Sequence, residues 1–202
     1  MKRNAIVFAA LALILSGTML FPAVSSAAET GTTTDPFGTN IESGAEISPT
    51  DETVTDEELY GDLDPELVQE YIEYMDYWDQ LDQLDVYEDK GIDTFNNTPG
   101  LTNATRKQIF LDLNNTIVPN YTKYVSGLKQ IQPAHPKLAA IHQKIIRGSY
   151  LQLEGMMLYK KAVSKTKINW TLYHQINPKI AASKKLMHQA EAEMYEYAAR
   201  FE

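Results

Sequence analysis

Apolar residues recur at intervals of three and four from residue 64 to the C-terminus, and this spacing restricts the fold more than any other feature. Such intervals place side chains on one face of an α-helix, whereas a half-buried strand would require alternation. Four long segments carry the pattern, separated by short stretches rich in Gly, Pro and Asn. The sequence therefore predicts an all-α fold, an up-down four-helix bundle over residues 64–202.

Capping residues predict where the first two helices begin and end. Asp64-Pro65 supplies an N-cap acid followed by proline at the first helical position, and Gly91 is expected to end this helix near residue 90. The second helix is expected to start near Asn103. Its apolar spacing keeps its phase across Pro119, so we expect the proline to kink one helix rather than to separate two.

The third and fourth helices follow a proline-containing turn. The third is predicted to run from near Pro136 to about Lys165. Asn169 could cap the fourth helix, but Asn177-Pro178 is the better candidate for its start. We therefore expect a fourth helix with a bend at 177–178.

The N-terminal residues predict export. Lys2 and Arg3 precede an apolar stretch and a run of small residues, which is the pattern of a secretory signal peptide over residues 1–28. The alternative is an uncleaved anchor, but Ser, Gly, Thr and Pro interrupt the apolar run. We therefore expect a secreted or cell-envelope protein with no transmembrane segment after cleavage.

Residues 29–63 contain ten acidic residues, no Lys or Arg, and few residues that could form a core. This composition predicts a disordered acidic linker ahead of the bundle. Removal of residues 1–28 leaves 16 basic and 27 acidic residues, a net charge of −11, so binding of nucleic acid by bulk charge is not expected. The chain has no cysteine, which excludes disulfides, cysteine-zinc sites and thiol catalysis.

An acidic residue occupies every third position from Glu70 to Glu88. Because a helix turns once in 3.6 residues, these carboxylates wind around the first helix. The first three lie on its polar face. Asp79, Asp82 and Asp85 instead enter the arc that apolar residues occupy two turns earlier.

Three arrangements would spare these aspartates from unpaired burial. The helix could project beyond its neighbours, the core seam could shift toward Tyr77, Leu81 and Leu84, or the aspartates could meet cations. Residues 64–93 carry a net charge of −10 and residues 94–202 carry +9, so we prefer charge matching within the bundle. The expected partners are Lys144, Arg147, Lys160, Lys161, Lys184 and Lys185.

A metal site is the main alternative. Asp79, Asp82 and Asp85 offer the oxygen ligands that calcium prefers, although side chains three apart on a helix diverge. His188 and Glu191 are also three apart and could share a metal ion. The Glu-x-x-His motif of di-iron bundles is absent. We expect no cofactor, and we expect His142, which lies on an apolar stripe, to be a hydrogen-bonded core residue.

No hydrolase, zinc-protease, nucleotide-binding or dinucleotide-binding motif occurs in the chain, so we expect a non-enzymatic protein. The stretch from Tyr121 through Leu128, "IQPAHPKL" and His142 resembles a loose class of small exported helical-bundle proteins of Gram-positive bacteria. The resemblance spans about residues 105–200 and implies a bacterial exported protein, with no activity and no functional residue attached. The sequence thus favours an interaction or structural role with an envelope component or protein partner, and a metal- or small-ligand-binding bundle is the alternative.

Overall fold

The computed structural model describes residues 64–201, which form an all-α bundle without strands in that range. The predicted signal peptide and linker lie outside the described residues. Among the helices of 64–201, none combines the length and hydropathy that a membrane span requires.

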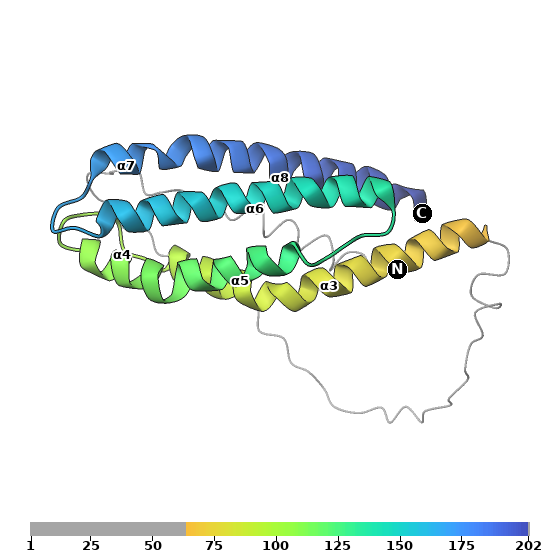
Figure 1. The fold of residues 1–202 in the computed structure, drawn as a ribbon, viewed down its shortest axis with the longest axis horizontal. Helices are drawn as coiled ribbons and strands as arrows, with labels where there is room; N and C mark the ends of the chain where they lie inside the picture. The colour runs from red at the N-terminus through yellow and green to blue at the C-terminus, as the bar shows by residue number, and fades with distance from the viewer. Residues whose placement is uncertain (1–63, 202) are drawn as a thin grey trace, which may run out of the picture.

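Four helical arms run alternately up and down (Figure 1). The first arm is one long helix, the second contains a π-helical segment, and the fourth is bent. In chain order the elements are α3 (Pro65–Asn96), α4 (Arg106–Asp112), η1 (Leu113–Ile117), α5 (Val118–Leu128), α6 (Pro136–Val163), α7 (Trp170–His174), α8 (Ile176–Ala198) and the 3₁₀ turn η2 (Ala199–Phe201).

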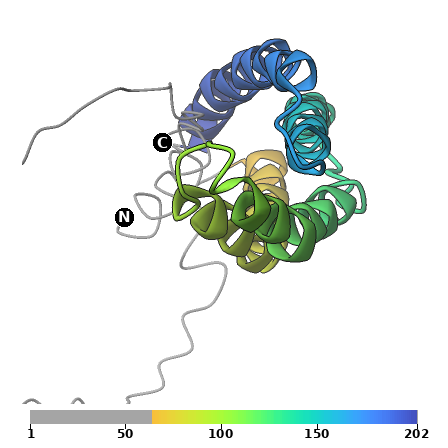
Figure 2. The same ribbon diagram turned by 90° about the vertical axis from the view of Figure 1, so that its left-hand side faces the viewer.

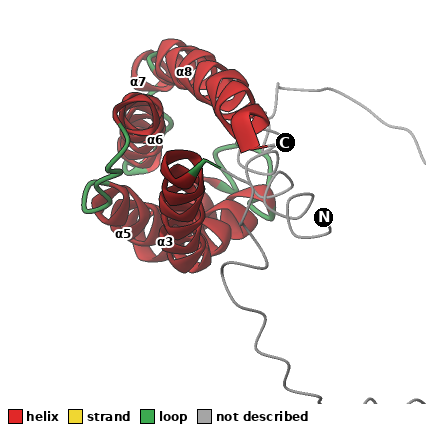
Figure 3. Cartoon of the chain, turned by 90° about the vertical axis from the view of Figure 1, so that its right-hand side faces the viewer, coloured by secondary structure: helices red, strands yellow, loops and turns green. Residues whose placement is uncertain are grey.

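The arms follow one another around a common core. Figures 2 and 3 look along the bundle from opposite ends and show α5 between α3 and α6, and α6 beside α8. At one end the first and last arms also meet, because the ring of Tyr74 on α3 lies 5.6 Å from that of Tyr197 on α8. Gly148 and Gly155 allow α6 to approach α8 closely, since they face Met187 and Ile180.

The core is rich in tyrosine as well as aliphatic residues, and its buried side chains recur at the three-four intervals of the sequence. The largest side chains with almost no exposed surface are Tyr77, Tyr121, Tyr124, Tyr197, Ile109, Leu113, Ile117, Leu128, Leu138, Ile141, Ile145 and Met156.

Two predicted helix caps are confirmed. The Asp64 carboxylate accepts a hydrogen bond from the backbone N–H of Glu66, 3.0 Å away, and Pro65 follows it as the first residue of α3. The Asn169 side chain accepts from the N–H of Leu172 at 3.1 Å. Both side chains satisfy amide groups that have no partner inside the helix.

The predicted end of the first helix is wrong. α3 continues through Gly91 to Asn96, and Gly91 is buried in its interior. The missing side chain is not required for packing here, because a Cβ atom would lie 3.6 Å from the Ile117 carbonyl oxygen of the neighbouring arm, which is an ordinary contact. The second arm starts at Arg106 rather than near Asn103.

The second arm passes Pro119 without a break, as predicted. The irregularity takes the form of the π-helical segment η1, which ends two residues before the proline. Proline has no amide hydrogen for the regular helix ladder, and a π segment is one way to absorb that loss.

The predicted bend of the last arm is misplaced. The helix axis is interrupted at Gln175, between α7 and α8, rather than at 177–178. Pro178 lies in the first turn of α8, where an amide N–H has no acceptor inside the helix. A proline at this position begins a helix without bending it.

Candidate functional site

The buried seam of α3 runs through Tyr77 and Leu81 and then through Glu88. The line of buried residues on α3 has thus shifted around the helix, as in the predicted arrangement in which the core seam moves toward Tyr77, Leu81 and Leu84. Asp79 and Asp82 are exposed as a result, and Asp85 is half-buried.

Opposite this seam, α3 presents a surface that we call the outer face. It combines carboxylates with two aliphatic side chains, of which Val86 is 63% exposed and Ile72 43%. Its residues are Ile72, Asp76, Asp79, Asp82, Val86, Asp89 and Asp93, all exposed. Among residues 64–201, no carboxylate of the outer face takes part in an ion pair.

The predicted charge matching is wrong: within residues 64–201, none of the six predicted basic residues forms an ion pair with a carboxylate of α3. Lys144 pairs instead with Glu193 of α8, at 2.6 Å. A second bridge between α6 and α8 joins Lys179 to Glu154, also at 2.6 Å. Lys144 and Lys179 therefore pair with carboxylates of the later arms, and the carboxylates of the outer face are left to solvent within residues 64–201.

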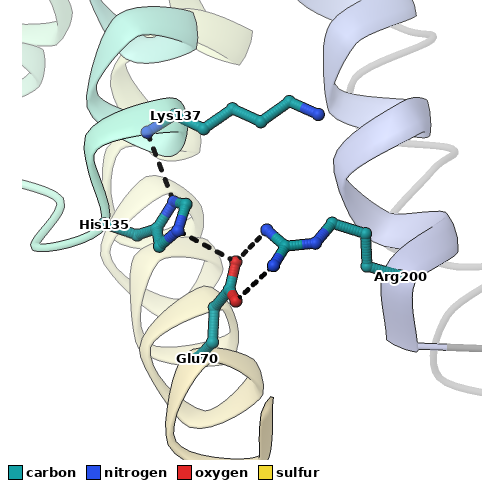
Figure 4. Close-up of polar contacts among 4 residues, drawn as sticks. All are labelled: Glu70, His135, Lys137 and Arg200. Atoms are coloured by element: carbon teal, nitrogen blue, oxygen red, sulfur yellow. Dashed lines mark hydrogen bonds and ion pairs between the residues drawn. The ribbon is translucent and has the colours of Figure 1, made fainter. Parts of the chain in front are cut away.

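Glu70 is the α3 carboxylate that does form ion pairs within the described range. It receives two hydrogen bonds from the Arg200 guanidinium, and the His135 Nε2 atom lies 3.3 Å from Glu70 Oε1 (Figure 4). His135 Nδ1 accepts the backbone N–H of Lys137 at 3.2 Å and so caps α6. Because Nδ1 accepts, the neutral ring carries its proton on Nε2 and donates it to Glu70. This cluster ties α3, α6 and the C-terminal turn together.

Glu88 is a carboxyl group inside the core, with 5% of its surface exposed. Burial raises its pKa to about 8, the Asp85 carboxylate adds to the rise, and a hydrogen bond from the Tyr124 side chain opposes it. Glu88 is therefore protonated at neutral pH. Burial also raises the pKa of Asp85, to about 6, with Asp82 and Asp89 contributing.

Sequence reasoning missed the burial of Glu88, although a signal was present. Tyr74, Leu81, Glu88 and Phe95 are spaced by seven residues, which places all four on one face of the helix. Three of the four are large and apolar, so the fourth shares their burial. The triplet spacing of the acids concealed this second periodicity.

His142 lies in the core and is hydrogen-bonded at both ring nitrogens, as predicted. Its Nε2 is 2.8 Å from the Leu128 carbonyl oxygen, which can only accept, so Nε2 carries the proton. Nδ1 then accepts from the Tyr77 hydroxyl at 3.1 Å. Burial lowers the pKa of His142.

The proposed metal ligands occupy two unlike settings. His188 Nδ1 and Glu191 Oε2 lie 3.5 Å apart on α8, and the imidazole is largely exposed. Asp79 and Asp82 point outward from α3. Nowhere in residues 64–201 do three or more His, Asp or Glu side chains converge as a metal centre requires. A metal site at these residues stays the alternative to charge matching, to be tested by ion binding.

Comparison with known proteins gives no relative: no family model matches the chain, and neither a curated protein nor a solved structure is detectably similar to it. The chemistry of the site is therefore argued from its residues alone. Carboxylates aligned on an exposed helix, with aliphatic side chains among them, form a surface that suits contact with a cationic partner.

Proposed function

We propose that this chain is an exported, envelope-facing protein that works by binding a partner protein through the outer face of α3, and not by catalysis. The observation that carries the proposal is that, within residues 64–201, no carboxylate of the outer face forms an ion pair. This holds although residues 97–201 contain fifteen basic residues that could have paired with them. Carboxylates that their own domain leaves unpaired are available to a basic partner.

The spacing of the outer face supports a protein partner. Ile72, Asp79 and Val86 are seven residues apart, so they lie along one line with roughly 10 Å between neighbours. The aliphatic side chains supply apolar contact at the two ends of this line. The carboxylates beside them would speed encounter with a basic surface and would select against an acidic one. The expected signal peptide supports an extracytoplasmic location.

The test compares two variants of the full chain with matched charge changes. One variant carries Asp79→Asn, Asp82→Asn and Asp89→Asn on α3, and the control carries Glu191→Gln, Glu193→Gln and Glu196→Gln on α8. Each immobilised protein is incubated with an envelope extract, and each captured protein is then purified and its dissociation constant measured.

We expect a basic protein to bind the wild type and the α8 variant about equally, and the α3 variant at least tenfold more weakly. Binding to the wild type should also weaken as salt is raised, because exposed charges are screened. Equal binding of one partner to all three proteins would contradict a role for the outer face.

A further inference from the structure

One end of the bundle carries a basic surface, which we call the basic end. It is built by residues 93–112 and 155–178, and these segments contain six basic residues against two carboxylates, Asp93 and Asp112. Asp112 accepts a hydrogen bond from Gln108. The basic residues are Arg106, Lys107, Lys160, Lys161, Lys165 and Lys167.

Direct contacts bring these segments together. The Arg106 Nη1 atom donates to the Val163 carbonyl oxygen at 2.7 Å, and the N–H of Ile168 donates to Asn103 Oδ1 at 3.4 Å. Figure 1 shows α4, α7 and the C-terminal end of α6 at the same end of the molecule, and Figure 2 views that end directly.

Helix stability explains only part of this charge. Lys160 and Lys161 lie in the last turn of α6, where a cation favours the helix dipole, and Lys160 also donates to the side chain of Asn114. Lys165 and Lys167 lie beyond the helix and are exposed. Neither forms an ion pair within residues 64–201.

Exposed apolar side chains accompany the lysines. Leu111 follows Lys107 by four residues on α4, and Met157 precedes Lys161 by four on α6, so each pair shares a helix face. Trp170 is 44% exposed and follows the lysine-rich loop. Its ring packs against Tyr173, with centroids 5.5 Å apart, which holds the indole in place at the surface.

We propose that the basic end binds the surface of a membrane that contains anionic lipids. Lysines attract lipid phosphates, and tryptophan favours the headgroup region, where its ring is part apolar and part polar. Leu111 and Met157 add shallow apolar contact of the kind that interfacial helices make. The inference is independent of the proposed function, because it uses none of the side chains of the outer face.

The test measures the quenching of Trp170 by brominated lipids in the full-length protein. The chain has two tryptophans, and Trp78 is only 2% exposed in the core, so a lipid quencher reports on Trp170. Sedimentation with vesicles would be ambiguous, since the apolar stretch within residues 1–28 is expected to enter any bilayer. Vesicles of brominated phosphatidylcholine, with and without one third brominated phosphatidylserine, provide the comparison.

We expect quenching with the phosphatidylserine vesicles, little with phosphatidylcholine alone, and none in a Trp170→Phe variant. Replacing Lys160, Lys161, Lys165 and Lys167 by Gln should weaken binding about fivefold for each lysine, and by more than 100-fold together. The control replaces Lys129, Lys137, Lys184 and Lys185 by Gln and should quench as the wild type does.

Equal quenching by neutral and anionic vesicles, or equal loss in both lysine variants, would overturn the proposal. Binding to soluble polyphosphate or to nucleic acid without lipid quenching would also overturn it, because the basic end would then recognise a polymer and not a membrane. The outer-face variant of α3 should quench like the wild type, so failure of one proposal is distinguishable from failure of the other.

Discussion

At the scale of the residue, Glu88 is an ionisable side chain buried in an otherwise largely apolar core. A carboxylate is costly to bury without a cation, and no basic side chain pairs with Glu88 among the ion pairs of residues 64–201. The groups that act on it are the carboxyls of Asp85 and Asp89 on its own helix and the Tyr124 side chain on α5. Protonation removes most of the cost, and this links the stability of the bundle to pH.

The Glu88→Gln variant should be more stable than the wild type at neutral and alkaline pH. The pKa of Glu88 is about 8 when folded and near 4.5 when unfolded, so the folded state holds the proton more tightly. The stabilisation is complete below pH 4.5 and is lost as pH rises to 8. Over that window the wild type should lose roughly 5 kcal/mol of its free energy of unfolding, a loss that the glutamine variant does not suffer. Urea unfolding at pH 5, 7 and 9 measures the difference.

The control for this prediction is Asp76→Asn, which removes a charge from the same helix at an exposed position that does not act on Glu88. Its stability should follow the pH dependence of the wild type, with a small offset. A Glu88→Gln variant that is less stable than the wild type at pH 9 would show that the carboxyl makes a favourable charged interaction in the core.

The Tyr77–His142 hydrogen bond gives a second prediction at this scale. Tyr77→Phe leaves the buried Nδ1 atom of His142 without its donor, and an unsatisfied buried acceptor costs about 1–3 kcal/mol. Chemical denaturation at pH 7 measures the loss. Tyr150→Phe is the matched control, because the Tyr150 ring is partly exposed and its change should be within about 0.5 kcal/mol. Equal effects of the two substitutions would argue against the buried hydrogen bond.

At the scale of the element, two glycines of the same helix pair play opposite roles. A Cβ atom at Gly91 of α3 would meet only ordinary contacts, the nearest at 3.6 Å. A Cβ atom at Gly127 of α5 would overlap the side chain of Leu84 on α3. The first glycine is therefore a cost to its helix, and the second is required by the packing of α5 on α3.

Gly91→Ala should stabilise the bundle by up to about 1 kcal/mol, because alanine favours the helix interior and fits the space. Gly127→Ala should destabilise it by about 1–3 kcal/mol, because Leu84 must leave its position. Thermal and chemical unfolding of the two variants measure whether each change in the free energy of unfolding has the expected sign. A Leu84→Ala change should relieve part of the Gly127→Ala penalty, and strict additivity of the two would contradict the predicted clash.

The sequence predicted the elements better than their ends. Asp64 and Asn169 were found because a capping side chain acts on amides within its own turn, which is local information. Gly91 was wrongly predicted to end the helix, because a glycine inside a helix and a glycine just after its last turn cannot be told apart from the residue type alone. The burial of Glu88 was missed for another reason, since the three-residue spacing of the acids drew attention away from the seven-residue spacing that Glu88 shares with buried apolar residues.

At the scale of the whole molecule, charge is divided between the arms. Residues 64–96 contain eleven acidic residues and Lys90, a net charge of −10, whereas residues 97–201 contain fifteen basic and five acidic residues, a net charge of +10. The described part of the chain is therefore neutral overall but strongly dipolar. The proposed partners follow this division, a basic protein for the acidic arm and an anionic surface for the basic end.

The same division raises the alternative of bound cations, and we expect thermal unfolding of the full chain to be indifferent to them. Asp79 and Asp82 are exposed and diverge, and His188 with Glu191 offers two ligands on one helix. Circular dichroism melts with chelator and then with excess calcium, zinc or iron measure the response. A metal at a hundred times its dissociation constant would add about 2.7 kcal/mol and raise the melting temperature by several degrees.

A clear rise with one metal would contradict this expectation, and variants would locate the ion. If the rise is lost in the double variant Asp79→Asn with Asp82→Asn, the carboxylates of α3 form a metal site. The proposal that the outer face binds a protein would then no longer be supported. Loss in His188→Ala alone would place the ion on α8 and leave the outer face unaffected. A melt unchanged by every metal leaves those carboxylates uncompensated within the described bundle, which is the condition that binding of a basic partner requires.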